Sequence, residues 1–241
     1  PIYHINGLCV TVMGTLASAS TLVIPYRFSV SAFWRIIETY RCSWFSAVPT
    51  QYSYILHNKD MPGKISCLRF ARSASAPLSP EIHRKFEERF KVPIIETMGL
   101  TETGSQISTN PLPPQTRKIG SPGKAYGNKL MIGNNVGDEM ARGITGEILV
   151  KGDNVMKGYF KQPDETANTI NENGWLKTGD LGYMDEDGYI FVTGRIKELI
   201  IKGGENIAPR EIDEALLDHE SVLEAAAFAV PCDNYGERVE A

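Results

Sequence analysis

The first stretch of the chain whose residue types could do chemistry is a loop rich in hydroxyls and glycines, Glu96 to Gly104. Gly99 would let the backbone approach a ligand closely, and the Thr101 hydroxyl could donate a hydrogen bond to a phosphate oxygen. Glu102 is a lone carboxylate among these groups, which suits a Mg²⁺ ion that keeps most of its waters and bridges to phosphate. The alternative is a helix cap with Thr101 as the N-cap residue and Glu102 in the first turn, and the local sequence leaves both interpretations open.

Two later stretches carry groups that could hold a ribose or a phosphate. Asp180 follows a glycine, and a carboxylate on a tight glycine turn can accept hydrogen bonds from both hydroxyls of a ribose. An isolated Gly-Asp pair more often satisfies only its own turn. Arg195 brings a planar fork of donors to a ribose or phosphate, and Gly203 and Gly204 leave the backbone open to a ligand. Without a ligand, this charged segment would be solvated surface.

The elements that would hold these groups begin with an alternation of strand and helix patterns. Apolar runs predict strands at 21–24, 44–48, 67–71 and 92–95, and amphipathic spacing predicts helices at 31–41, near 52–56 and after Ser79-Pro80. Strands joined by helix-length crossovers pair in parallel, and parallel sheets bind ligands outside the carboxyl ends of their strands. Ligand-binding loops are therefore expected at 48–50, 72–78 and 96–104.

After residue 110 the pattern changes to short β segments. Strands are predicted at 129–132, 147–150, 181–184 and 189–193, with a hairpin turn at 185–188. A helix is predicted after Ala208-Pro209, and a strand at 225–230. The predicted fold class is α/β: a parallel-sheet subdomain over 1–110, a small antiparallel β subdomain over 111–196 and the start of an α+β carboxy-terminal domain over 197–241.

Composition narrows the class of protein. Hydrophobic residues make up 42% and charged residues 22% of the 241, which is an ordinary globular balance. Because the net charge is -4 and no basic cluster follows one face of an element, nucleic acid is not an expected partner. The 4 cysteines lie far apart without a C-x-x-C pair, so neither a disulfide framework nor a zinc site is expected, and a reducing, cytoplasmic location fits best.

The ends of the chain predict that it is an internal fragment. It starts at Pro1 without an initiator Met or a signal-peptide pattern, and it stops within an alternating strand pattern. Residues 5–25 carry no charge, but Asn, Gly, Ser and Thr dilute this run below the continuous apolar stretch of a membrane span. A buried helix followed by a strand is expected there, and no transmembrane segment.

Together these stretches resemble the motifs of the adenylate-forming superfamily, which includes acyl-CoA synthetases, firefly luciferase and the adenylation domains of peptide synthetases. The resemblance covers essentially the whole chain, and four motifs have the order and spacing of the family. It implies that the Thr101 hydroxyl binds the AMP phosphate, that Glu102 binds magnesium, and that Asp180 and Arg195 hold the ribose. It also implies that Lys197 is the hinge about which the carboxy-terminal lid domain rotates between two half-reactions.

The resemblance also implies which residues line the adenine, the nucleotide and the acid. Met98 stands where the family usually has an aromatic residue that stacks on adenine, and Ala74-Ser75 replaces the commoner Gly-Gly. The implied nucleotide-binding residues are Ser75, Ala76, Pro77, Met98, Gly99, Asp180, Arg195, Gly203 and Gly204. The implied acid pocket is bordered by His4, Gly99 and Leu100.

The function that this resemblance implies is that of an ATP-dependent carboxylic acid:CoA ligase, with ATP or AMP, Mg²⁺ and coenzyme A as cofactors. Lys197 favours a CoA ligase, since peptide-synthetase adenylation domains usually have Asp at the hinge position. In the family, the phosphate loop precedes the position of Pro1 and the catalytic Lys follows that of Ala241, so this chain alone is expected to be inactive.

The alternatives are a peptide-synthetase-type adenylation domain or a non-catalytic AMP- or acyl-AMP-binding fragment. The apolar residues after His4 favour a fatty or aryl acid, although core packing explains them equally well.

Overall fold

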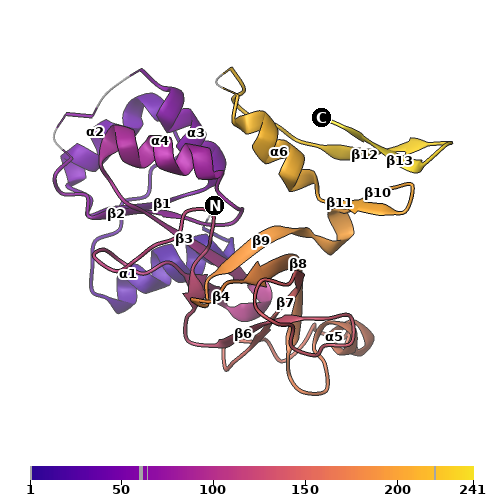
Figure 1. Ribbon diagram of the computed structural model, residues 1–241. Coiled ribbons are helices and arrows are strands. Elements are labelled where there is room, and N and C mark those ends of the chain that lie inside the picture. The colour runs from indigo at the N-terminus through magenta and orange to yellow at the C-terminus, as the bar shows by residue number, and fades with distance from the viewer. Residues whose placement is uncertain (1, 60–61, 64, 220) are drawn as a thin grey trace. The chain divides into compact units, whose positions relative to one another are not determined.

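A computed structural model describes residues 2–59, 62–63, 65–219 and 221–241 (Figure 1). The chain divides into two compact units, Pro1–Tyr126 and Gly127–Ala241. Each unit has its own sheet or sheets, and the two units are described separately below.

The first unit is built on one mixed sheet with the strand order β1-β2-β3-β4-β5. β1 pairs with β2 and β2 with β3 in parallel, whereas β4 and β5 are antiparallel additions. The strands are β1 (Trp44–Ala47), β2 (Phe70–Ser73), β3 (Ile94–Leu100), β4 (Ser105–Thr109) and β5 (Lys124–Ala125). The predicted parallel pairing is confirmed for the three strands that are separated by helices.

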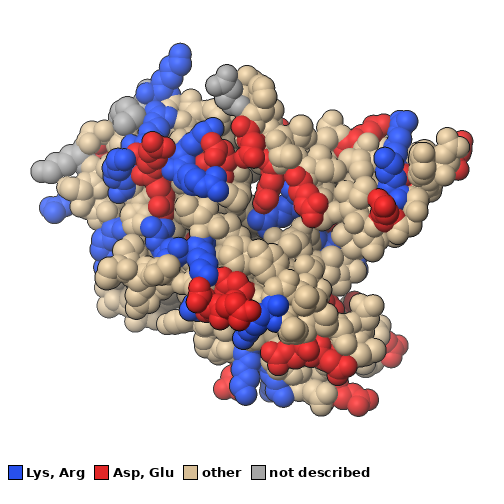
Figure 2. All heavy atoms as spheres, viewed as in Figure 1, with Lys and Arg blue, Asp and Glu red and all other residues tan. Residues whose placement is uncertain are grey.

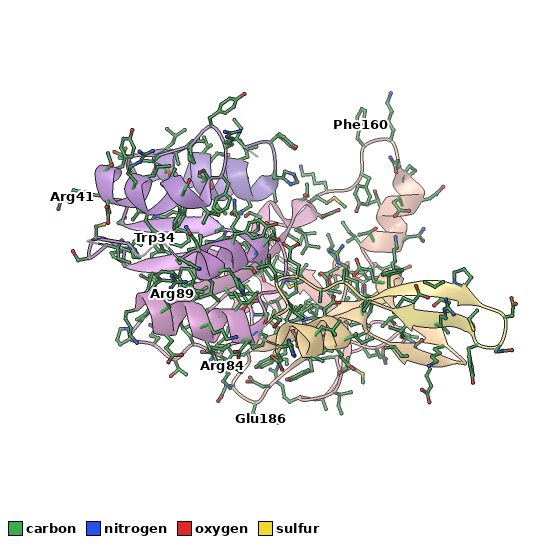
Figure 3. The ribbon with its side chains drawn as sticks, turned by 90° about the horizontal axis from the view of Figure 1, so that it is seen from above. Trp34, Arg41, Arg84, Arg89, Phe160 and Glu186 are labelled. Atoms are coloured by element: carbon green, nitrogen blue, oxygen red, sulfur yellow. The ribbon has the colours of Figure 1, made fainter. Side chains whose placement is uncertain are left out.

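Three helices cover one face of the parallel strands: α2 (Val30–Tyr40), α3 (Pro49–His57) and α4 (Pro80–Phe90) (Figure 1). Each helix contributes apolar side chains to one buried cluster, which also includes residues of all three parallel strands. The Phe86 ring lies 5.0 Å from the Tyr52 ring and 4.8 Å from the Phe90 ring, and Trp34 lies within this layer (Figure 3). Apolar burial at this helix–sheet contact stabilises the strands whose ends carry the candidate site.

The structure of the amino-terminal segment differs from the buried helix and strand that the sequence predicts. A π-helix, η1 (Asn6–Met13), continues into a short α1 (Gly14–Ala17), but none of the η1 residues is buried. Residues 21–24 form no strand; the described residues provide no neighbouring strand to satisfy their N–H and C=O groups. The predicted helix is present, but Thr15 is its one buried residue among those described, and the predicted strand at 21–24 is absent.

The second unit begins with a four-stranded antiparallel sheet in the order β6-β7-β8-β9. Its elements are β6 (Lys129–Gly133), β7 (Gly146–Lys151), α5 (Pro163–Thr169), β8 (Leu176–Met184) and β9 (Ile190–Arg195). Asp185 closes the β8–β9 hairpin, since its carbonyl accepts from Gly188 and its carboxylate from the Tyr189 N–H at 2.8 Å. The predicted antiparallel sheet and its hairpin turn are confirmed.

A second antiparallel sheet in this unit has the strand order β11-β10-β13-β12. It follows a 3₁₀ turn, η3 (Ile196–Glu198), and comprises β10 (Ile200–Lys202), β11 (Glu205–Ile207), β12 (Phe228–Cys232) and β13 (Gly236–Glu240). The predicted helix after Ala208-Pro209 is α6 (Pro209–Leu217). The α+β character expected for this part of the chain is present, and the predicted fold class is confirmed.

The two compact units divide the chain differently from the three predicted domains. Residues 111–126, including β5, belong to the first unit, and the predicted boundary at 196/197 lies within the second unit, at η3 between its two sheets. The three-part division stays a prediction. Among the described residues, no helix combines the length and apolar character needed to cross a bilayer.

Charged side chains of both signs are interspersed on the face shown in Figure 2. On α4, for example, Glu81 forms ion pairs with Arg84 and Lys85 at 3.3 and 3.0 Å. A continuous basic stripe, which nucleic-acid binding requires, is not seen on that face.

Candidate functional site

The carboxyl-terminal part of strand β3 contains a close backbone approach. The β3–β4 register shifts between Met98 and Gly99, and a Cβ atom on Gly99 would lie 2.0 Å from the carbonyl oxygen of Ser105. A glycine is therefore required at position 99 by the chain's own packing. The partly buried Met98 and the exposed Gly99 place this strand end next to the turn that follows.

The turn η2 (Thr101–Thr103) is capped by a residue that the sequence interpretation did not name. The Leu100 N–H donates to the Thr103 hydroxyl oxygen at 3.2 Å, and this hydroxyl lies 3.0 Å from the carbonyl oxygens of Leu100 and Ser105. The N-cap residue is Leu100, so the alternative role of Thr101 as the N-cap is wrong. Thr101 is exposed, and its hydroxyl makes no hydrogen bond within the described part of the chain, while Glu102 beside it is partly buried.

The small-residue loop after β2 lies next to this strand end. The Leu78 N–H donates to Oε1 of Glu96 at 3.1 Å, which ties the loop to β3. Ser75, Ala76 and Pro77 are exposed, and Ser75 has a φ of +79°, in the left-handed region. Such backbone conformations are costly for a residue other than glycine and cluster at ligand sites.

The amino-terminal segment contributes His4 and Asn6. The His4 side chain is exposed, and its ring lies 5.0 Å from that of Tyr3. Two residues later, Oδ1 of Asn6 accepts a hydrogen bond from Nη1 of Arg72 at 2.6 Å. The described contacts connect this segment to β2 through Asn6, and they do not join the His4 ring to Gly99 or Leu100.

Arg72 is the first residue of the expected ligand-binding loop 72–78, but the sequence interpretation did not name it as a candidate site residue. It lies in β2 and is 7% exposed, with hydrogen bonds to side chains from three other elements. Burial lowers its pKa to about 10, partly offset by the electrostatic effect of Tyr52. A charged residue directly after the predicted strand 67–71 and directly before the small-residue loop was the signal that could have identified it.

In the second unit, a distortion of β8 positions Asp180. Thr178 donates its hydroxyl to the Ile148 carbonyl at 2.8 Å, and the Gly179 N–H donates to Oε1 of Glu147 at 3.0 Å, with a φ of +75° at Gly179. The Asp180 side chain is buried and accepts a hydrogen bond from Nε of Arg195 on β9 at 2.7 Å. Burial raises the pKa of Asp180, and the Arg195 guanidinium opposes that rise.

The remaining predicted residues of the second unit are exposed. Lys197 is the middle residue of η3, between β9 and β10. Gly203 and Gly204, with φ of +61° and +90°, form a two-residue hairpin turn between β10 and β11. Only residues that tolerate positive φ fit both positions of such a turn, so these glycines have a structural role that requires no ligand.

The structure thus brings the predicted residues together in two groups, one in each unit. Ser75, Ala76 and Pro77 follow β2, and Met98, Gly99 and Leu100 end the neighbouring strand β3, which leads directly into Thr101 and Glu102. Asp180 and Arg195 form an ion pair on adjacent strands. The roles of these residues toward a ligand stay predictions.

The donor set around Glu102 fits Mg²⁺ rather than a structural transition metal. No cluster of three or more His, Cys, Asp or Glu side chains that could hold an ion occurs among the described residues. Mg²⁺ is commonly held by one or two carboxylates together with substrate phosphates and waters, so the partly buried Glu102 carboxylate beside the exposed Thr101 hydroxyl is a suitable partial site.

These features are those of an α/β protein whose candidate site lies at the carboxyl ends of its parallel strands. A family model with the description "AMP-binding enzyme" matches residues 1–160. The chain belongs to this AMP-binding enzyme family, as the adenylate-forming motifs predicted.

Curated relatives of the chain are CoA ligases. It is 51% identical over 242 residues to the sulfoacetate–CoA ligase of Cupriavidus necator, covering 100% of this chain and 47% of that protein. It is 40% identical over 244 residues to the oxalate–CoA ligase of Arabidopsis thaliana, covering 99% of this chain and 47% of that protein. The chain spans about half the length of these relatives.

Solved structures have the same fold. ATP-bound MatB from Rhodopseudomonas palustris superposes with a TM-score of 0.92 at 33% identity, covering 99% of this chain and 47% of that one. The o-succinylbenzoate CoA synthetase MenE of Bacillus subtilis, in complex with its acyl-adenylate intermediate, gives a TM-score of 0.86 at 34% identity, with coverages of 99% and 48%.

Proposed function

We propose that the protein containing this chain is an ATP-dependent carboxylic acid:CoA ligase. The main support for this proposal is the 51% identity to a CoA ligase over the whole chain. The exposed Thr101 hydroxyl at the end of β3 and the Asp180–Arg195 pair support it, because they supply donors and acceptors suited to the phosphate and ribose of a nucleotide.

The proposed reaction has two group transfers. A carboxylate oxygen of the acid attacks the α-phosphorus of ATP, the bond to the bridging oxygen breaks, and pyrophosphate leaves. The thiol sulfur of coenzyme A then attacks the acyl carbon, the bond to AMP breaks, and the thiol proton passes to solvent. Because neither step needs a nucleophilic side chain, the residues of the chain act by positioning and by charge stabilisation.

In this mechanism the first unit positions the phosphate and the adenine. The Thr101 hydroxyl donates to an oxygen of the α-phosphate, and Glu102 helps to hold the magnesium ion, which when bound neutralises phosphate charge. The loop containing Ser75 forms one side of the adenine site and Met98 the other. The strained φ of Ser75 is consistent with a loop held in place for a ligand.

The second unit contributes the ribose contacts and the hinge. Asp180 accepts hydrogen bonds from the ribose hydroxyls while Arg195 orients its carboxylate. Gly203 and Gly204 are further residues that we assign to the nucleotide, through their exposed backbone. Lys197, in the turn between two separate sheets, is the pivot that allows the carboxy-terminal part to adopt one arrangement for each half-reaction.

We also propose that the acid is small and carries a second anionic group. Two of the relatives are named for such acids, sulfoacetate and oxalate. We propose this class of acid in place of the fatty or aryl acid that the apolar residues after His4 favoured.

The experiment is a product assay on the intact protein with ATP, Mg²⁺, coenzyme A and a panel of small acids. We expect an acyl-CoA thioester and AMP to form in equal amounts with at least one acid. AMP and acyl-adenylate without thioester, or acyl transfer only to a carrier-protein thiol, would favour the peptide-synthetase alternative. Nucleotide binding without turnover of any acid would favour the non-catalytic alternative.

A further inference from the structure

The guanidinium of Arg72 is buried in the first unit and is held by neutral groups. The side chain of Arg72 is held by Oδ1 of Asn6 at 2.6 Å, Oγ of Ser46 at 3.1 Å and Oε1 of Gln106 at 3.4 Å. These three acceptors are neutral and come from η1, β1 and β4. Within the described residues Arg72 forms no ion pair.

Two other partly buried arginines in this chain have carboxylate partners. Arg117, with a side chain 19% exposed, is paired with Glu87 at 2.5 Å, and Arg210, at 17%, is paired with Glu214 at 2.7 Å. Arg72 is more buried than either, at 7%. Because a buried charge without a counter-ion is unfavourable, Arg72 is the position in this set where an anionic ligand would stabilise the protein most.

The guanidinium also has donors left for a ligand. An arginine side chain has five N–H donors in a planar fork, and the three hydrogen bonds to Arg72 use three of them. Among the described contacts, Nε and Nη2 each keep one donor, and these adjacent nitrogens are a pair through which arginine can bind carboxylates and other oxyanions. Near Arg72, the fully buried Tyr52 hydroxyl has no hydrogen-bond partner among the described residues.

Arg72 lies close in sequence to the predicted nucleotide loop, and two of its hydrogen-bond partners connect it to the predicted acid pocket. It is three residues before Ser75, a chain distance of at most about 10 Å. Its partner Gln106 is the Cα partner of Gly99 in the β3–β4 ladder, and its partner Asn6 is two residues from His4. Arg72 is therefore held by residues next to two segments that the family resemblance assigns to the acid, and it lies close to the predicted nucleotide site.

We propose that Arg72 binds the second anionic group, a carboxylate or a sulfonate, of a small acid substrate. Asn6, Ser46 and Gln106 hold the guanidinium in orientation, and the first carboxylate of the acid remains directed at the nucleotide. This inference rests on the proposed ligase function, because it takes the acid as the ligand, and it adds the residue that selects the class of acid.

The test compares acids that differ only in the second charge, using the intact protein. The pairs are sulfoacetate with methylsulfonylacetate and malonate with malonamate, each assayed by acid-dependent ATP–pyrophosphate exchange. Arg72→Met removes the charge and keeps much of the side-chain volume. We expect it to lower kcat/KM for the dianionic acid by roughly 100-fold or more, as for truncation of a buried charge pair, and to change kcat/KM for the neutral partner by less than about fivefold.

Two variants separate this role from a structural one. Arg72→Lys keeps the positive charge but lacks the planar set of guanidinium donors. Compared with Arg72→Met, it should recover part of the preference for the dianionic acid. Arg89→Met is the matched control: Arg89 lies on α4 (Figure 3) and donates to the backbone carbonyls of Leu56 and Asn58, so the preference should be unchanged. An equal loss for both acids of a pair in Arg72→Met, or an unchanged preference, would overturn the proposal.

Direct binding measurements test the Arg72 site separately from the proposed ligase activity. Calorimetric titration of sulfoacetate and malonate into the intact protein, with AMP present, should show binding that Arg72→Met abolishes and Arg89→Met retains. Binding of this kind without pyrophosphate exchange for any acid would contradict the ligase function and support the Arg72 site. Exchange with acids whose binding is insensitive to Arg72→Met would support the ligase and contradict the site.

Discussion

Nε of Arg195 lies 2.7 Å from Oδ1 of Asp180, and the two residues are directly opposite each other in the β8–β9 ladder. The Asp180 side chain is 8% exposed and that of Arg195 is 56% exposed, so the pair joins a buried carboxylate to a guanidinium at the surface. Burial raises the pKa of Asp180, and Arg195 favours its ionised form. The arrangement presents an oriented acceptor, which is the role that ribose binding requires.

Replacing Asp180 with Ala in the intact protein should weaken ATP and AMP binding. A hydrogen bond to a charged group contributes about 1.5–3 kcal/mol, so affinity should fall by roughly 10- to 150-fold for each ribose hydrogen bond lost. Equilibrium titration with a fluorescent AMP analogue measures it. Glu186→Ala removes an exposed carboxylate from the turn of the same hairpin (Figure 3) and should leave the affinity unchanged. If Asp180→Ala bound AMP with unchanged affinity, Asp180 would have only a structural role in its own turn.

Lys197→Pro should separate the two half-reactions. Proline fixes φ near -65° and removes a backbone donor, so a pivot in η3 would be held in one arrangement. We expect ATP–pyrophosphate exchange to persist while acyl transfer to coenzyme A falls by at least about tenfold. Lys197→Ala, which keeps backbone freedom, is the control for the loss of the side chain. Equal loss of both half-reactions would indicate misfolding, and loss of neither would place the pivot elsewhere between Gly194 and Lys202.

Gly99→Ala should destabilise the end of β3. The added Cβ would lie 2.0 Å from the Ser105 carbonyl oxygen, and backbone atoms can relieve such a contact only by moving the strand. We expect the free energy of unfolding to fall by about 1–3 kcal/mol, as in overpacked sites, together with loss of adenylation. Gly14→Ala is the matched control, since its Cβ would be 3.5 Å from the nearest atom, in a helix. Denaturant titration that gives equal stabilities for the two variants would contradict the close approach.

Stability at low pH should depend on Glu87. Burial alone would raise its pKa, but hydrogen bonds from His83, Arg117 and the Ile94 N–H outweigh this and lower the pKa from 4.5 to about 2. A depressed pKa contributes stability that is present above pH 4.5 and is lost as the pH falls toward 2.

Glu87→Gln should therefore lower the free energy of unfolding at pH 7 by about 1–3 kcal/mol and flatten its pH dependence between 4.5 and 2. Glu88→Gln changes the neighbouring, exposed carboxylate and should do neither. Urea unfolding at several pH values measures both effects. A Glu87→Gln variant as pH-dependent as the unchanged protein would show that other groups carry the acid sensitivity.

The elements that could be predicted from sequence are those whose pattern is local. Helix α4 is an example: Ser79 and Pro80 mark its start, and Phe86 and Phe90 recur at helical spacing and are buried. The strand predicted at 21–24 failed because a strand also depends on a partner, which the sequence does not show.

The same limit applies to the site. Motif residues such as Thr101 and Asp180 could be named from residue type and spacing, whereas the capping role of Thr103 and the pairing of Asp180 with Arg195 depend on register and turn geometry. Arg72 lies in the expected ligand-binding loop 72–78, but it was not singled out because its partners, Asn6 and Gln106, are 66 and 34 residues away in sequence. Only the tertiary fold places these neutral acceptors around one buried charge.

Formation of an acyl-adenylate can be tested directly by following an oxygen atom from the acid through the reaction. If the acid attacks the α-phosphorus of ATP, an acid labelled with ¹⁸O in its carboxylate must transfer one ¹⁸O to the phosphate of AMP when the acyl group passes to coenzyme A. Mass spectrometry of AMP from the intact protein, with ATP, Mg²⁺, coenzyme A and the preferred acid, should show one ¹⁸O per AMP formed. Label absent from AMP while thioester accumulates would contradict acyl-adenylate formation.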